Sequence, residues 1–142
     1  MDDSLRRKLA GAGAALFAIG MLTGFWTALA MGDVVKVAIP RLSIATHLNA
    51  LLGGLWLIAL ALTLDLLHYG PVGRRRLALL AAFPAWANWL ITLVASLLGV
   101  RGLRYTGELR NDAIAALLQA LVVAPTIAAV FVWVWGFRAR KA

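Results

Sequence analysis

Long uncharged stretches separated by short charged ones dominate the sequence. Four runs lack Asp, Glu, Lys and Arg altogether, and together they hold 96 of the 142 residues. These runs are residues 9–32, 42–64, 77–100 and 113–137. Each is longer than the roughly 20 mainly apolar residues that a membrane-spanning helix needs. The pattern predicts an all-α integral membrane protein, a bundle of four transmembrane helices in one domain of residues 1–142. The predicted spans are about 9–31, 42–64, 77–99 and 113–137.

Composition excludes several other classes of protein. With 63% hydrophobic and 14% charged residues, the chain is far from a soluble domain, which has roughly 45–50% apolar and about 25% charged residues. The absence of cysteine excludes disulfides, thiolate metal sites and covalent c-type haem. The net charge of +8 lies in short segments that flank the spans, so no soluble basic face is left for nucleic acid. The expected partner is the lipid bilayer.

The distribution of basic residues predicts the orientation in the membrane. With four spans, both termini and the middle loop share one side. That side carries Arg6, Arg7, Lys8, Arg74, Arg75, Arg76, Arg138, Arg140 and Lys141. The other side carries Lys36, Arg41, Arg101, Arg104 and Arg110. Because cytoplasmic loops carry the excess of Lys and Arg, we expect both termini in the cytoplasm and the chain in a bacterial inner membrane.

The N-terminal segment also resembles a signal peptide, with basic residues at 6–8 and Ala28-Leu29-Ala30 as a cleavage pattern. The apolar run before Ala28 is about 19 residues, however, and a signal core has about 7–15. The run also carries Gly20 and Gly24 at the spacing of helix-packing pairs. A retained first span is therefore favoured over a cleaved signal.

Small residues recur along the first and last spans. They are Ala10, Ala14, Ala18, Gly20 and Gly24 in the first, and Ala116, Ala120, Ala124 and Ala128 in the last. Small residues let helices approach closely inside lipid, either within a compact bundle or between protomers. Pro84 and Pro125 each remove one hydrogen bond from a span. Each proline can kink its helix and so open a cavity between helices. Alternatively, the helix accommodates the proline without any functional consequence.

Polar residues inside the spans are few, and each is a candidate for function. They include His47, Asn49 and Thr63 in the second span, Asn88, Thr92 and Ser96 in the third, and Gln119 and Thr126 in the fourth. His47 is the only histidine inside a span. It can be a histidine hydrogen-bonded to a neighbouring helix, or a ligand. Zinc needs three or four protein ligands, whereas haem iron can be held by one axial histidine.

His68 offers no second axial ligand for the same haem. It follows His47 by 21 residues on what is nearly one helix, which separates the two by roughly 30 Å at 1.5 Å per residue. A haem held by His47 alone keeps an open sixth position at the iron. No buried carboxylate lies at the depth of His47, so a hydrolase triad is excluded.

Several short motifs, in order, resemble those of a known family. They are His47-Leu48-Asn49 through Gly53-Gly54-Leu55-Trp56, then Trp86-Ala87-Asn88-Trp89, with Gly20-Met21-Leu22-Thr23-Gly24 before them and Arg101-Gly102-Leu103 after them. Their order and spacing resemble the small membrane isomerases that include styrene oxide isomerase and hydroxylaminobenzene mutase. The resemblance covers all four spans.

The resemblance implies more than composition can. It implies a four-helix protein that assembles as a homotrimer and binds haem b near a subunit interface, with His47 as the axial ligand. Ferric iron would take the oxygen of a small aromatic or apolar substrate, either an epoxide or an aryl hydroxylamine, which then rearranges without net redox change. Trp86 and Asn88 would line the cofactor, and Asn88 and Thr92 would orient the substrate as candidate catalytic residues.

Three positions depart from the epoxide isomerase pattern. Gly53, Pro84 and Thr92 stand where that enzyme has asparagine, aspartate and tyrosine, which disfavours styrene oxide itself as the substrate. The sequence therefore favours a haem-dependent isomerase or mutase. The alternative is a non-enzymatic four-span subunit or small-molecule-binding bundle that kept the fold and lost the chemistry.

Overall fold

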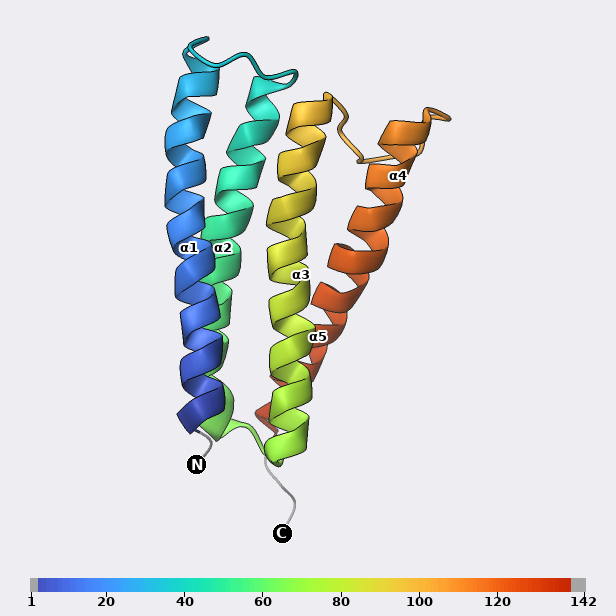
Figure 1. The fold of residues 1–142 in the computed structure, drawn as a ribbon. Helices are drawn as coiled ribbons and strands as arrows, with labels where there is room; N and C mark the ends of the chain where they lie inside the picture. The colour runs from blue at the N-terminus through green and yellow to red at the C-terminus, as the bar shows by residue number, and fades with distance from the viewer. Residues whose placement is uncertain (1–2, 139–142) are drawn as a thin grey trace.

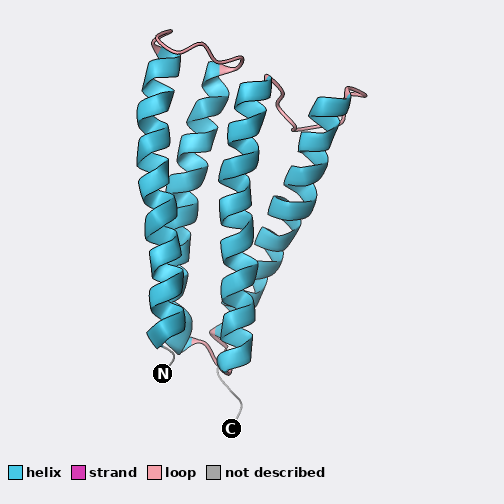
Figure 2. Cartoon of the chain, in the orientation of Figure 1, coloured by secondary structure: helices cyan, strands magenta, loops and turns pink. Residues whose placement is uncertain are grey.

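A computed structural model describes residues 3–138, which form helices and connecting loops (Figure 2). Within that range, four helical segments are long and apolar enough to cross a membrane. The first three are α1 (Asp3–Met31), α2 (Pro40–Thr63) and α3 (Pro71–Leu98), and the fourth runs from Leu109 to Gly136. The predicted all-α bundle of four spans is confirmed.

The helix ends follow from local sequence. Pro40 and Pro71 stand in the first turns of α2 and α3, where a missing N–H removes no helical hydrogen bond. Gly99 ends α3 with φ at 72° and donates its N–H to Ala95 O, a left-handed conformation that glycine adopts without strain. Glu108 caps the start of the fourth segment by accepting the Asn111 N–H.

The helices alternate in direction, so the start of α1 and the end of α5 lie at the same end of the bundle (Figure 1). α1 packs mainly on α2, α2 packs on α3, and the fourth segment packs on α3. The first two helices approach through Gly13 and Gly54. A Cβ on Gly54 would lie 2.7 Å from Gly13 O, and a Cβ on Gly13 would lie 2.7 Å from Gly54 O.

The fourth segment changes its helical geometry in the middle. It consists of α4 (Leu109–Leu117), the π-helix η2 (Leu118–Val123) and α5 (Ala124–Gly136). The wide turn comes directly before Pro125, which cannot donate a backbone hydrogen bond, and Ala124 N–H bonds to Gln119 O, five residues back. Pro84, in contrast, is buried within an uninterrupted α3. The two prolines therefore have different effects on their helices. The helix is widened into a π-turn next to Pro125, whereas α3 accommodates Pro84 without interruption.

The small residues divide into two groups. Gly20 and Gly24 pack against α2, as their helix-packing spacing predicts. The alanines of the fourth segment, in contrast, are all exposed: Ala116, Ala120, Ala124 and Ala128. Ala14 and Ala18 of α1 are exposed as well. Ala10 packs partly against the core, whereas the other alanines of both stripes face away from the other helices of the same chain.

Candidate active site

His47 lies on the side of α2 that faces α1, and its side chain is half-buried. Its Nδ1 lies 2.7 Å from Gly20 O. A carbonyl oxygen can only accept, so Nδ1 carries the proton and donates it, and the lone pair of the neutral ring is on Nε2. Within residues 3–138, the hydrogen bond of this ring is the one made by Nδ1. A histidine that ligates a metal has this arrangement, because its other ring nitrogen usually donates to a carbonyl or carboxylate.

Gly24 provides the space for the His47 ring. A Cβ at Gly24 would lie 2.6 Å from His47 Cε1 and 2.8 Å from Nδ1. Any larger residue at this position would therefore displace the imidazole. The residues that follow the two glycines, Met21 and Phe25, are exposed. The imidazole thus lies half-buried between α1 and α2.

A second polar group joins α2 to α3 through Asn49, Asn88 and Thr92. Asn49 Nδ2 donates to Asn88 Oδ1 at 3.2 Å and approaches Thr92 Oγ1 at 3.5 Å. Thr92 Oγ1 in turn donates to Asn88 O at 2.7 Å. The sequence places Asn88 and Thr92 on one helical face. It gives no sign that Asn49, on another helix, completes the cluster.

The structure does not bring His47 together with Asn88 and Thr92. Residues that are two positions apart on an α-helix point in directions that differ by about 200°. His47 therefore contacts α1, whereas Asn49 contacts α3. A single pocket of these residues is therefore not formed by the contacts within one chain. Their predicted roles as ligand and substrate groups stay predictions.

The tryptophans of α3 lie beside the asparagine cluster. Trp89 Nε1 donates to Thr23 Oγ1 of α1 at 3.1 Å, and the Trp86 and Trp89 rings meet edge to face with centroids 6.2 Å apart. Trp89 and Thr23 also line a groove of about 390 Å³ between α1 and α3. The other lining residues are Ile19, Leu22, Trp26, Leu93 and Leu97. Sites for small ligands have volumes of about 300–1,000 Å³ and apolar, aromatic walls, and the groove has a volume and walls of this kind.

Three further intramembrane polar residues, Thr63, Ser96 and Gln119, have structural contacts. Thr63 Oγ1 accepts from Trp133 Nε1 at 3.0 Å, and Ser96 Oγ donates to Ile39 O at 3.4 Å. Gln119 is exposed on the π-helix and accepts from the Tyr105 hydroxyl at 3.4 Å. His68 Nδ1 lies 2.9 Å from Gly136 O at the far end of α2, so it joins the second loop to the end of the fourth segment.

The donors in the chain limit how a metal can be held. Among residues 3–138, no group of three or more His, Cys, Asp or Glu side chains could surround a metal ion. A cofactor that brings its own ligands and needs one axial histidine is compatible with such a donor set.

Comparison with known proteins decides the family. The family model described as styrene oxide isomerase matches residues 5–138. The chain belongs to the styrene oxide isomerase family. A hydroxylaminobenzene mutase of Ectopseudomonas oleovorans is 30% identical over 148 aligned residues, which cover 99% of this chain and 86% of the mutase. No solved structure matches the chain.

As a member of the styrene oxide isomerase family, the chain is an enzyme, an isomerase, rather than a non-enzymatic subunit. Its activity is of the styrene oxide isomerase or hydroxylaminobenzene mutase type. The four apolar helices make it an integral membrane protein.

Proposed function

We propose that this isomerase uses haem b to rearrange a small aromatic compound within one molecule, and that an aryl hydroxylamine suits its site better than an epoxide. The main observation behind this proposal is the geometry of the His47 side chain. Its Nδ1–H donates to Gly20 O, which leaves the lone pair of the ring on Nε2. The full-length similarity to a hydroxylaminobenzene mutase supports the substrate class.

The residues around His47 fit a haem. The Gly20 carbonyl fixes the ring tautomer, and Gly24 leaves the ring its place between the helices. When bound, ferric haem would supply a Lewis acid toward a substrate oxygen. His47 would hold the iron through Nε2, and no other histidine of the described chain lies within a span.

The asparagine cluster and the adjoining groove would position the substrate. Asn88 and Thr92 offer polar atoms where they meet Asn49, and Trp89 with Trp26 offers aromatic walls. In the mutase reaction the N–O bond breaks and a C–O bond forms at a ring carbon, and the proton that this carbon loses is balanced by one gained at the nitrogen of the same molecule. These groups therefore need only orient one substrate, without a redox partner or a second reactant.

The residues at Gly53 and Pro84 argue against an epoxide. Resemblance to the epoxide isomerase leads one to expect polar side chains there, but a Cβ on Gly53 would lie 3.2 Å from Leu16 Cδ2 and 3.4 Å from Ala85 Cβ. Pro84 is buried in α3. Apolar packing thus occupies the space in which those polar groups would stand.

Haem-supplemented expression tests the proposal. We expect purified protein with a Soret band that converts an aryl hydroxylamine to an aminophenol of the same composition, faster than it converts an aryl epoxide. Product analysis by mass spectrometry and chromatography measures both reactions. A colourless protein that isomerises neither substrate would contradict the proposal.

A trimer would complete the site. Ala14 and Ala18 of α1 and the alanine stripe of the fourth segment are exposed, small residues favour close helix contacts in lipid, and the His47 side chain is only half-buried within one chain. We therefore expect three chains in the detergent-solubilised particle, measured by native mass spectrometry. A monomer that holds haem and is fully active would contradict an interfacial cofactor.

Both termini are expected in the cytoplasm of a bacterial inner membrane. Seven of the nine basic residues assigned to that side fall within the described chain, and Arg140 and Lys141 lie outside it. By the positive-inside rule, a reporter fused after Ala142 should show cytoplasmic activity in bacterial cells. Periplasmic activity of the same fusion would show that the chain has the opposite orientation in the membrane.

A further inference from the structure

A groove lies between α1 and α3, at the end of the bundle where the two helices begin. Part of its wall is basic and the rest is apolar. Its volume is about 420 Å³. Lys8 of α1 and Arg75 of α3 line it together with Ser4. The rest of the lining is apolar: Leu5, Leu9, Ala12, Ala78, Leu79 and Ala82. Two cations from separate helices thus converge at one groove that continues along apolar side chains.

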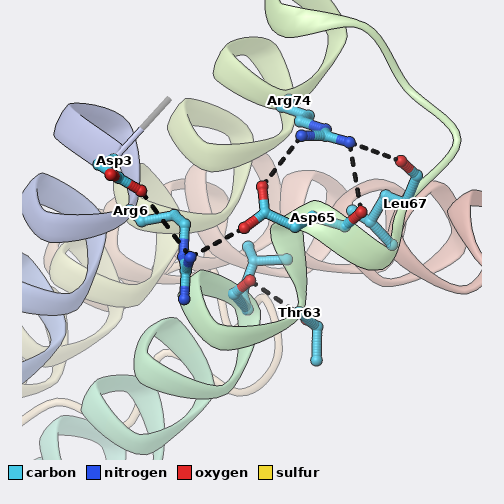
Figure 3. Close-up of polar contacts among 7 residues, drawn as sticks. Asp3, Arg6, Thr63, Asp65, Leu67 and Arg74 are labelled. Carbon is cyan, nitrogen blue, oxygen red and sulfur yellow. Dashed lines mark hydrogen bonds and ion pairs between the residues drawn. The ribbon is translucent and has the colours of Figure 1, made fainter. Parts of the chain in front are cut away.

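The positive charge of this groove is not neutralised by the nearest intramolecular acid. Asp65 binds Arg6 at 2.9 Å through Oδ2 and Arg74 at 3.1 Å through Oδ1, as Figure 3 shows. Asp3 lies 4.0 Å from Arg6. In the described chain, neither Lys8 nor Arg75 forms an ion pair with a carboxylate. An anion from outside the chain can therefore pair with both.

The depth of the groove indicates what kind of anion fits. Ala12 follows Lys8 by four residues and Ala82 follows Arg75 by seven, so the apolar walls extend roughly 6–10 Å beyond the cations at 1.5 Å per residue. Those walls belong to the uncharged runs 9–32 and 77–100, which form the membrane-spanning parts. The cations thus lie at the height of lipid headgroups and the walls at the height of the first acyl carbons.

We propose that this groove is a binding site for an anionic phospholipid of the adjacent leaflet. Its phosphate and headgroup would pair with Lys8 and Arg75, with Ser4 in reach as a hydroxyl partner, and its acyl chains would cover Leu79 and Ala82. Basic pockets between membrane helices are suited to such headgroups. A water-soluble phosphate would leave the apolar walls uncovered, and a zwitterionic lipid brings a cation of its own toward the two basic side chains.

The lipid would also connect two helices that pack mainly on α2 rather than on each other. Bound across the groove, it links the first turns of α1 to the first turns of α3. It therefore stabilises the same pair of helices that line the Trp89 groove farther along the bundle. The site does not depend on the haem or on the reaction proposed above.

The test compares lipids and matched variants of the full chain in detergent. The groove variant is Lys8→Gln with Arg75→Gln, and the control is Arg7→Gln with Arg76→Gln, which removes the same charge from exposed neighbours that do not line the groove. Phosphatidylglycerol, phosphatidylcholine with the same acyl chains, and inorganic phosphate are added separately. Thermal unfolding and native mass spectrometry measure stabilisation and bound lipid.

We expect phosphatidylglycerol to raise the Tm of the unmodified chain and of the control more than phosphatidylcholine does, with one retained phosphatidylglycerol per chain. The groove variant should bind it about tenfold more weakly or worse, because both headgroup cations are gone. Equal losses in the two variants would show attraction to basic surface in general and overturn the site. Equal stabilisation by inorganic phosphate would overturn the lipid as its ligand. If the double variant fails to fold, Lys8→Gln and Arg75→Gln tested singly should each reduce lipid retention.

Discussion

Replacement of His47 by alanine is expected to remove the haem absorption band and the isomerase activity together. No other histidine lies within a span, because His68, whose Nδ1 contacts Gly136 O in the same way, follows the end of the second helix. Loss of a group that only orients a metal ligand costs about 10–100-fold in metal affinity or activity. Loss of the ligand itself should reduce turnover by about a hundredfold or more. Absorbance spectra and turnover of the purified variant measure both effects.

Two matched variants separate the ligand from its surroundings. His68→Ala should keep the spectrum and the turnover, because His68 binds Gly136 O at the opposite end of α2. Asn88→Ala should keep the spectrum but lower turnover roughly fivefold, since one hydrogen bond to the substrate is worth about 1 kcal/mol. If His47→Ala keeps both its Soret band and its turnover, the assignment of the ligand is wrong.

The sequence is sufficient to predict the four spans, because the physics that decides them acts residue by residue. Charged side chains are expensive in hydrocarbon, so the uncharged runs identify the membrane segments directly. The helices nevertheless extend past those runs. α1 begins at Asp3 and α3 at Pro71, since a helix can continue into the headgroup region, where charged side chains are solvated.

The rotation of each helix about its own axis is harder to predict. Gly20 and Gly24 have a spacing that indicates close packing, and they do pack against α2. The alanine stripe that includes Ala120 has the same kind of spacing, yet it faces outward. Small residues permit close approach without specifying which partner approaches, so the pattern could not decide between contacts within a chain and contacts between chains.

The candidate site shows the same limit. The spacing of Asn88 and Thr92 reveals that they share a face, but not that Asn49 meets them across the α2–α3 interface. Helical geometry could have shown one feature in advance, because His47 and Asn49 are two positions apart and must point in opposite directions. Within one chain, the contacts of His47 and of Asn88 therefore belong to different helix interfaces.

Substitution of Gly54 by valine should have the largest effect on the stability of the bundle. A Cβ there would lie 2.7 Å from Gly13 O and 2.7 Å from Phe17 N. Both are backbone atoms of α1, so no side-chain rotation can relieve the clash and the two helices must separate. Overpacking costs typically 1–3 kcal/mol, and more where the backbone has to move. We expect a loss of at least about 2 kcal/mol in the free energy of unfolding, measured by denaturant titration in detergent with circular dichroism.

Gly11→Val is the matched control on α1. A Cβ at Gly11 meets no atom within 4 Å, and surface substitutions usually change stability by less than about 0.5 kcal/mol. The same separation that destabilises Gly54→Val would also move Gly20 and Gly24 away from the His47 ring, so this variant should lose haem while the control retains it. Equal stability and equal haem content in the two variants would show that close contact between α1 and α2 neither holds the bundle together nor positions His47.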